Sequence, residues 1–166
     1  IGRMYYMLTE VSILPIQSVY FIGERAITAE VLNEEPLIIK FHEVLTDEEC
    51  QGLIDSAKSR LQRSKLINKE VSQIRTSSGM FFEENESPLI NEIEKRVASL
   101  MHLPIENAEG LQVLHYEPGQ EFMAHFDYFR DQHPSSQNNR ISTLVLYLND
   151  VEKGGETTFP NLGITC

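Results

Sequence analysis

The chain has 166 residues, of which 41% are hydrophobic, and it carries a formal charge of −11 with a pI near 4.9. This length and apolar content fit one domain with a core and exclude wholesale disorder, while the acidic balance argues against a nucleic-acid binder. Two cysteines, Cys50 and Cys166, are too few for the disulfide framework of a small secreted scaffold and favour a reducing compartment.

The N-terminal part of the chain is apolar but weakly patterned. Its most hydrophobic stretch, residues 4–23, is interrupted by Glu10, Pro15 and Gln17, so it predicts neither a membrane span nor a signal peptide. We therefore expect a cytoplasmic protein with no membrane partner. Residues 1–34 are predicted to form an N-terminal arm or extra edge strands, ahead of a domain over residues 35–166.

Two helices are predicted in the first half of that domain, after a strand over residues 37–41. Thr46 and Glu49 form a capping-box pattern, which predicts a helix near 47–61. Ser87 and Pro88 combine a cap with a proline at the first helical position, which predicts a second helix over 88–102. Apolar residues recur at helical spacing in both, so we expect both helices to pack on one face of the major sheet.

From residue 111 the hydrophobic period changes to two. Strands are predicted over 111–116, 121–126, 140–149 and 156–159, with a turn at 153–155. Two helices followed by several short strands indicate an α+β fold in which helices support one face of a sandwich or barrel.

Two short motifs place a histidine and an acid two residues apart. Period-two geometry directs His125 and Asp127 to the same face of an extended chain, which supplies two ligands of a 2-His-1-carboxylate iron site. His115 and Glu117 form a second such triplet. Because chance gives roughly 0.75 triplets of this kind in a chain of this composition, either one alone is weak evidence for a metal site.

The order of the motifs is much more specific. The sequence resembles the catalytic core of the prolyl 4-hydroxylases, which are 2-oxoglutarate- and Fe(II)-dependent dioxygenases, and is most similar to the short, stand-alone bacterial-type enzymes. The similarity extends over residues 35–162. The segments that carry it are 75–79, 111–120, 125–129, 140–149 and 154–160. The resemblance implies a double-stranded β-helix, or jelly roll, supported by the two helices.

The resemblance also implies a role for each matching residue. His125 and Asp127 match the first two iron ligands, and Tyr116 and Thr157 match residues that bind 2-oxoglutarate. The residues that match the peptide-substrate site are Arg75, Thr76, Ser77, Phe122 and Arg140. The family often has tyrosine where this chain has Phe122.

The segment 75–77 matches a mobile loop that closes over the peptide, and we expect the small residues 77–79 to act as its hinge. The implied partners are Fe(II), 2-oxoglutarate, ascorbate and a proline-containing peptide or protein. The oligomeric state stays open, a homodimer included.

The family's second histidine ligand and its 2-oxoglutarate-binding lysine or arginine have no match before residue 166. His133 follows Asp127 in a polar loop, where we do not expect it to replace that ligand. We therefore expect a jelly roll without its last strands, and little turnover by this stretch alone. Two alternatives stay open: a catalytically dead peptide-binding remnant of the family, and a cupin-like metalloprotein that uses His115, Glu117, His125 and Asp127.

Overall fold

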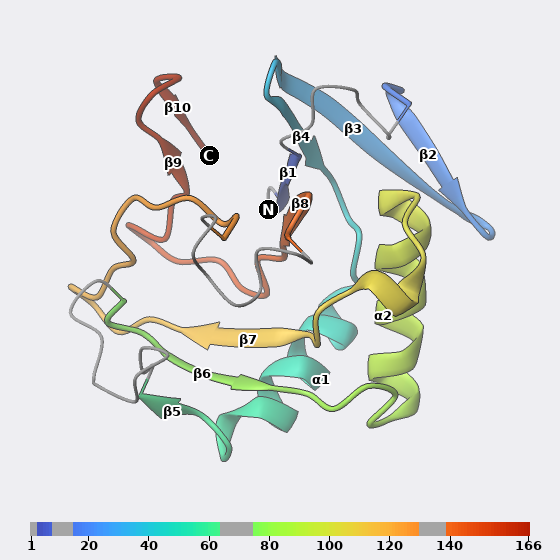
Figure 1. The fold of residues 1–166 in the computed structure, drawn as a ribbon. Coiled ribbons are helices and arrows are strands. Elements are labelled where there is room, and N and C mark those ends of the chain that lie inside the picture. Colours follow the sequence, from blue (N-terminus) through green and yellow to red (C-terminus); the bar gives the residue numbers. More distant parts are fainter. Residues whose placement is uncertain (1–2, 8–14, 64–74, 130–138) are drawn as a thin grey trace. The chain divides into compact units, whose positions relative to one another are not determined.

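The computed structural model describes residues 3–7, 15–63, 75–129 and 139–166 (Figure 1). Its contacts divide the chain into two compact units. Unit 1 comprises residues 1–44 and 124–166, and unit 2 comprises residues 45–123. Each unit is described by itself. Together the helices and antiparallel sheets make an α+β structure, as the sequence predicted.

Unit 1 is built on a five-stranded antiparallel sheet with the order β2-β3-β4-β1-β8. Its strands are β1 (Arg3–Met7), β2 (Val19–Ile22), β3 (Arg25–Glu34), β4 (Leu37–Phe41) and β8 (Ser142–Val145). A second, two-stranded sheet pairs β9 (Thr158–Phe159) with β10 (Ile164–Thr165). β3, which ends at Glu34, and β4, which begins at Leu37, are neighbours in one sheet.

The core of unit 1 forms around β4. Its residues Leu37, Ile38, Ile39 and Phe41 are buried, and such β-branched and aromatic side chains suit a strand that is covered by its neighbours. Gly23 has a φ of +60° in the two-residue connection between β2 and β3, a conformation that glycine adopts without strain. Because β4 spans residues 37–41, the strand expected there is confirmed.

Unit 2 contains both predicted helices and a three-stranded antiparallel sheet. α1 (Asp47–Lys58) and α2 (Pro88–Met101) contact each other, and α1 also contacts β7 of that sheet. The sheet has the order β5-β6-β7, formed by β5 (Gln62–Arg63), β6 (Ser78–Phe81) and β7 (Gln112–His115), and the short 3-10 helix η1 (Ile105–Asn107) follows α2. The sheet that α1 contacts is therefore this three-stranded sheet of unit 2.

Both helix starts follow the predicted caps. The Thr46 hydroxyl accepts a hydrogen bond from the Glu49 N–H, and the Glu49 carboxylate accepts one from the Thr46 N–H, at 3.2 and 2.9 Å. The Ser87 hydroxyl accepts from the Ile90 N–H at 3.3 Å. The buried residues Cys50, Leu53, Ala57, Ile90, Ile93 and Leu100 belong to the predicted apolar stripes.

Several strands are shorter than their sequence pattern suggests. The segment 121–126 contains no strand, and its backbone forms one isolated bridge, from Phe122 to Arg75. β8 covers only 142–145 of the expected 140–149, and β9 only 158–159 of the expected 156–159. Alternation predicts which face a side chain takes, but a strand also needs a hydrogen-bonding partner along its length. For that reason the strand expected at 121–126 is wrong and the other two predictions were too long.

The expected hinge at 77–79 is wrong. Ser78 and Gly79 lie within β6, which pairs with β5 on one side and with β7 on the other, and Ser77 is fully buried. Residues whose backbone is paired on both sides do not make a flexible hinge.

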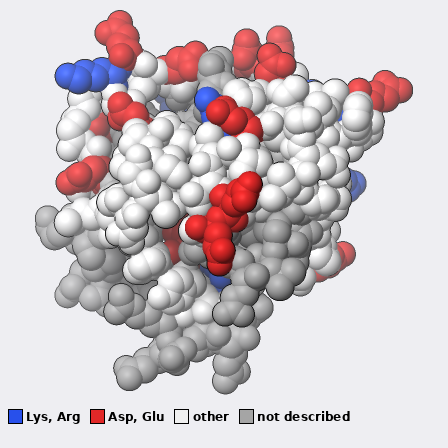
Figure 2. All heavy atoms as spheres, turned by 90° about the horizontal axis from the view of Figure 1, so that it is seen from above, with Lys and Arg blue, Asp and Glu red and all other residues white. Residues whose placement is uncertain are grey.

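The charges on the face seen in Figure 2 are mostly acidic. Red carboxylates are scattered over it and around its rim, and blue basic groups are few. In the part of the chain that the structure describes, no helix has both the length and the apolarity that crossing a membrane requires.

Candidate functional site

His125 and Asp127 lie side by side in unit 1, on an irregular segment without a strand. The His125 Nε2 atom is 3.0 Å from the Asp127 Oδ1 atom, and 38% and 36% of the two side chains are exposed. Between and after them, the rings of Phe126 and Tyr128 lie 5.3 Å apart. The pair predicted from the sequence is therefore assembled, with both donor atoms directed to one place.

The second triplet forms a comparable pair in unit 2. His115 ends β7, and its Nε2 atom lies 2.9 Å from the Glu117 Oε1 atom. These side chains are more exposed, at 53% and 67%. The Glu117 N–H also donates to the Gln120 side chain at 2.9 Å. Distance within the pair therefore does not distinguish the two triplets.

Neither pair is extended by a third ligand among the residues described. No group of three or more His, Cys, Asp or Glu side chains that could hold a metal occurs within these ranges. His133 lies outside the described residues. The described part of the candidate metal site thus consists of one imidazole and one carboxylate.

Thr157 is held in place by backbone and side-chain bonds in unit 1. Its N–H donates to the Cys166 carbonyl at 2.9 Å, and the Cys166 N–H donates back at 3.0 Å, which extends the β9–β10 hairpin by one pair. Its hydroxyl forms a hydrogen bond with the hydroxyl of Tyr147. Burial of the half-buried Tyr147 raises the pKa of its hydroxyl, and the bond to Thr157 acts in the opposite direction.

Tyr147 was not identified from the sequence as a site residue. It lies in the segment 140–149, where the alternating pattern indicated only an aromatic residue in a strand. Its partner is ten residues away, and nothing in the local pattern indicated the contact.

Arg140 contacts the segment that carries the candidate ligands. Its guanidinium lies over the Phe129 ring, 4.7 Å from the ring centroid, and donates to the Asp127 carbonyl oxygen at 3.3 Å. Arg140 thus lies beside the backbone of the candidate metal ligand Asp127.

The remaining predicted site residues belong to unit 2. The Arg75 guanidinium lies 5.0 Å from the centroid of the Phe122 ring and donates to the Gln112 side chain at 3.2 Å. Thr76 is joined to Glu121 by three hydrogen bonds: its N–H and its hydroxyl donate to the Glu121 carbonyl, and the Glu121 N–H donates to that hydroxyl, at 2.9, 3.0 and 2.7 Å.

The segment 75–77 is consequently fastened to 121–122 in this structure. Tyr116, one residue beyond β7, is 39% exposed. The predicted site residues are therefore divided between the two units, with His125, Asp127, Arg140 and Thr157 in unit 1 and the others in unit 2.

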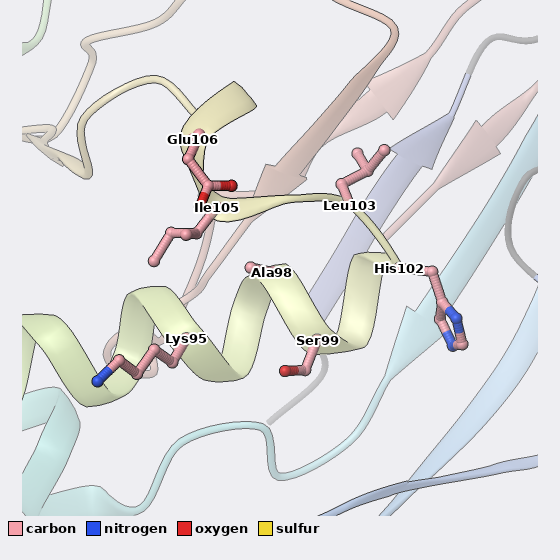
Figure 3. Close-up of a pocket in the computed structure, with 7 residues that line it drawn as sticks. All are labelled: Lys95, Ala98, Ser99, His102, Leu103, Ile105 and Glu106. Atoms are coloured by element: carbon pink, nitrogen blue, oxygen red, sulfur yellow. The ribbon is translucent and has the colours of Figure 1, made fainter.

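A hollow of about 390 Å³ lies at the C-terminal end of α2, away from these groups within unit 2. Its lining consists of Lys95, Ala98, Ser99, His102, Leu103, Ile105 and Glu106. Figure 3 shows that the Lys95 and His102 side chains extend in opposite directions. Since its polar groups do not converge, the hollow does not form a second site.

Comparison with known proteins supports a family assignment. Residues 111–164 match the model of the 2OG-Fe(II) oxygenase superfamily. The chain is 43% identical over 137 residues to probable prolyl 4-hydroxylase 10 of Arabidopsis thaliana, and 42% identical over 144 residues to prolyl 4-hydroxylase 5 of the same plant. These alignments cover 79% and 83% of the chain but only 47% and 49% of the relatives, so the chain spans about half their length.

The resemblance seen in the ordered motifs is confirmed by these matches, and the pairs at 115–117 and 125–127 both fall within the matched region. Thr157 falls within it as well, whereas Arg75 precedes it. The more specific expectation of a bacterial-type enzyme stays a prediction, since the two relatives named are plant proteins.

Proposed function

Because the chain carries a domain of the prolyl 4-hydroxylase family of 2OG-Fe(II) oxygenases, we propose that the protein hydroxylates peptidyl proline with Fe(II) and 2-oxoglutarate. The observation that carries the proposal is the His125–Asp127 pair, which lies in the region that matches the oxygenase model and is the less exposed of the two His–acid pairs there. The substrate class comes from the relatives, which are named as prolyl 4-hydroxylases.

The pair has the donor chemistry that Fe(II) needs. One imidazole and one carboxylate are two of the three donors of a facial triad, a set that would leave positions open on the metal. The His125 Nε2 and Asp127 Oδ1 atoms contact each other at 3.0 Å, so both side chains would be available to hold one ion. Fe(II) held there with 2-oxoglutarate would supply the oxidising chemistry of the family.

Two hydroxyls are proposed to bind the 2-oxo acid. Tyr116 and Thr157 both carry groups that donate hydrogen bonds to a carboxylate. The Thr157 hydroxyl is fixed by its bond to Tyr147, so its direction is set before a ligand arrives. Preorganised donors of this kind bind an anion without the cost of being ordered on binding.

The residues proposed to contact a proline-containing peptide are Arg75, Thr76 and Phe122 in unit 2 and Arg140 in unit 1; Ser77, expected from the family resemblance, is fully buried and offers a peptide no surface. Aromatic faces are the usual contact surface for proline rings, and the side chain of Phe122 is partly exposed. The cation–π contact with Arg75 holds the Phe122 ring from one side. The loss of the family's tyrosine hydroxyl at Phe122 removes one polar contact but leaves the aromatic face.

Three finer features complete the proposal. The antiparallel sheets are compatible with a jelly roll, and the family resemblance extends to ascorbate as a reductant. The low cysteine content supports a cytoplasmic location.

Metal binding provides the first test, with a matched control in the chain itself. The complete product of the reading frame that encodes residues 1–166 is titrated with Co(II) or Fe(II) without oxygen, and the affinity is measured by calorimetry. His125→Ala and Asp127→Ala should each lower the affinity at least tenfold, whereas His115→Ala should change it less than twofold. If His115→Ala causes the larger loss of metal affinity, the metal site is at 115–117 and the result favours the cupin-like alternative.

Activity provides the second test. Formation of succinate and hydroxyproline is measured with 2-oxoglutarate and a proline-rich peptide. Asp127→Ala should abolish both products, and His115→Ala should retain them. Peptide binding with neither product from the unmodified protein would support the non-catalytic alternative.

A further inference from the structure

The segment 125–129 carries both candidate ligands yet has no place in a sheet. Residues 125–129 belong to no helix or strand of the described part of the chain. Metal affinity depends on how well ligands are held before the metal arrives. Side-chain contacts to this segment therefore bear on whether His125 and Asp127 present their donors together.

Asn139 provides that contact. Its side-chain oxygen accepts a hydrogen bond from the Phe129 N–H, and its side-chain nitrogen donates to the Phe129 carbonyl, both at 2.7 Å. The two bonds use one donor and one acceptor on each partner, which is how paired residues of neighbouring strands bond. The amide of Asn139 thus replaces a strand neighbour for Phe129.

Arg140 extends the contact toward the ligands. Its N–H donates to the same Asn139 oxygen at 2.9 Å, so that the two lone pairs of this atom serve Phe129 and Arg140. Its guanidinium covers the Phe129 ring and donates to the Asp127 carbonyl. Residues 139 and 140 together contact the backbone at 127 and at 129.

From this geometry we propose that Asn139 is a positioning residue for the His125–Asp127 pair. It acts through Phe129: the reciprocal amide bonds fix the chain two residues after Asp127 and place Arg140 where it reaches the Asp127 carbonyl. The inference rests on the proposed function, since it assigns to Asn139 a part in metal binding. Asn139 is proposed to act only through its bonds to Phe129 and Arg140, and not as a ligand.

The test compares two variants of Asn139 with a matched control. Asn139→Ala removes both bonds. Asn139→Asp has the same shape but sets an oxygen against the Phe129 carbonyl, and it adds a negative charge that by simple attraction would strengthen cation binding. Asn149→Ala is the control, because Asn149 is also exposed and its side chain bonds to the carbonyl of its sequence neighbour Asp150.

The measurements are Co(II) affinity and the Co(II) absorption spectrum, with Tm of the metal-free protein to confirm folding. Loss of an outer contact to a metal ligand typically lowers affinity tenfold to hundredfold. We expect a loss of about tenfold or more for Asn139→Ala and Asn139→Asp, a changed spectrum and a nearly unchanged Tm, with no loss for Asn149→Ala.

The outcomes separate this inference from the proposed function. If the unmodified protein shows no Co(II) binding that depends on His125, the metal site fails and the role of Asn139 fails with it. If that binding is present but Asn139→Ala stays within twofold of the unmodified protein, the proposed function stands and the inference alone is refuted. Tighter binding by Asn139→Asp would likewise refute it, since charge would then outweigh position.

Discussion

The ion pair between α1 and α2 offers a quantitative test of the reasoning about unit 2. The Arg96 guanidinium donates to both carboxylate oxygens of Glu49, each at 2.7 Å, and only 12% and 14% of the two side chains are exposed. The bonds to Glu49 raise the pKa of Arg96, as expected for a charge held by its partner. Glu49 also completes the capping box at Thr46.

Replacing Arg96 with methionine should lower the free energy of unfolding by about 3 kcal/mol. Breaking a buried pair typically costs 3–5 kcal/mol because the remaining charge is left without a partner. The lower end applies here, since the carboxylate keeps its bond to the Thr46 N–H and water reaches part of it. In Glu49→Gln/Arg96→Met neither charge remains, so the double variant should lose clearly less than the sum of the single losses.

Urea unfolding of all four proteins, followed by circular dichroism, gives this cycle. Arg60→Met is the control, because Arg60 pairs with Glu86 on the surface and its side chain is 38% exposed. Its effect should be much smaller and should shrink further with added salt. Equal losses at Arg96 and Arg60, or additive effects within the cycle, would refute the argument that this pair is buried and couples the helices.

Three further predictions concern the core, the sheet and pH. Leu53→Ala and Ile93→Ala should each cost about 2–5 kcal/mol in urea unfolding, because both side chains are fully buried; losses below about 0.5 kcal/mol would contradict their packing. Gly79→Ala should destabilise the protein by about 1–3 kcal/mol, since its Cβ would lie 2.9 Å from the end of Leu114, and Leu114→Ala should recover part of the loss in the double variant. The raised pKa of Tyr147 contributes stability that is complete below its ordinary value of 10.0 and is lost as pH rises through the raised value, so Tyr147→Phe should show a shallower decline above about pH 10, and an identical alkaline decline would contradict it.

Local chemistry explains why the helices were predictable. Each cap, at Thr46 and at Ser87, is formed by residues within four positions of one another. The apolar stripe of each helix that follows can also be recognised without knowledge of a distant partner. Both helices begin where the caps place them. Their ends fall one to three residues earlier than expected; α2 ends before His102, whose left-handed conformation closes the helix.

Long-range pairing explains why the strands were less predictable. The alternation at 121–126 is genuine, but the described backbone partners of this segment are Arg75 and Thr76, about 45 residues earlier in the chain, and they make an isolated bridge rather than a strand ladder. Ser78 and Gly79 were expected to be part of a hinge because they are small, yet β5 and β7 pair with them from both sides. The contacts of Asn139 and Tyr147 could not be predicted for the same reason, because a single asparagine or tyrosine in a sequence does not indicate which distant residue it bonds to.

The candidate site also shows where spacing stops being informative. Two triplets with the same spacing give pairs at 2.9 and 3.0 Å, so the i, i+2 relation predicts contact and not the identity of a metal site.

Two physical differences favour the later pair, His125 and Asp127, as the metal site. His125 and Asp127 are less exposed than His115 and Glu117, so charges there are less screened by water, and Asp127 has one rotatable bond fewer than Glu117 to restrict on binding. The later pair is also followed by Arg140, which contacts the backbone of Asp127 directly, whereas His115 is held by its strand partner Ser78. We therefore expect metal binding to depend on the surroundings of each pair rather than on the motif, and the experiments above change those surroundings as well as the proposed ligands.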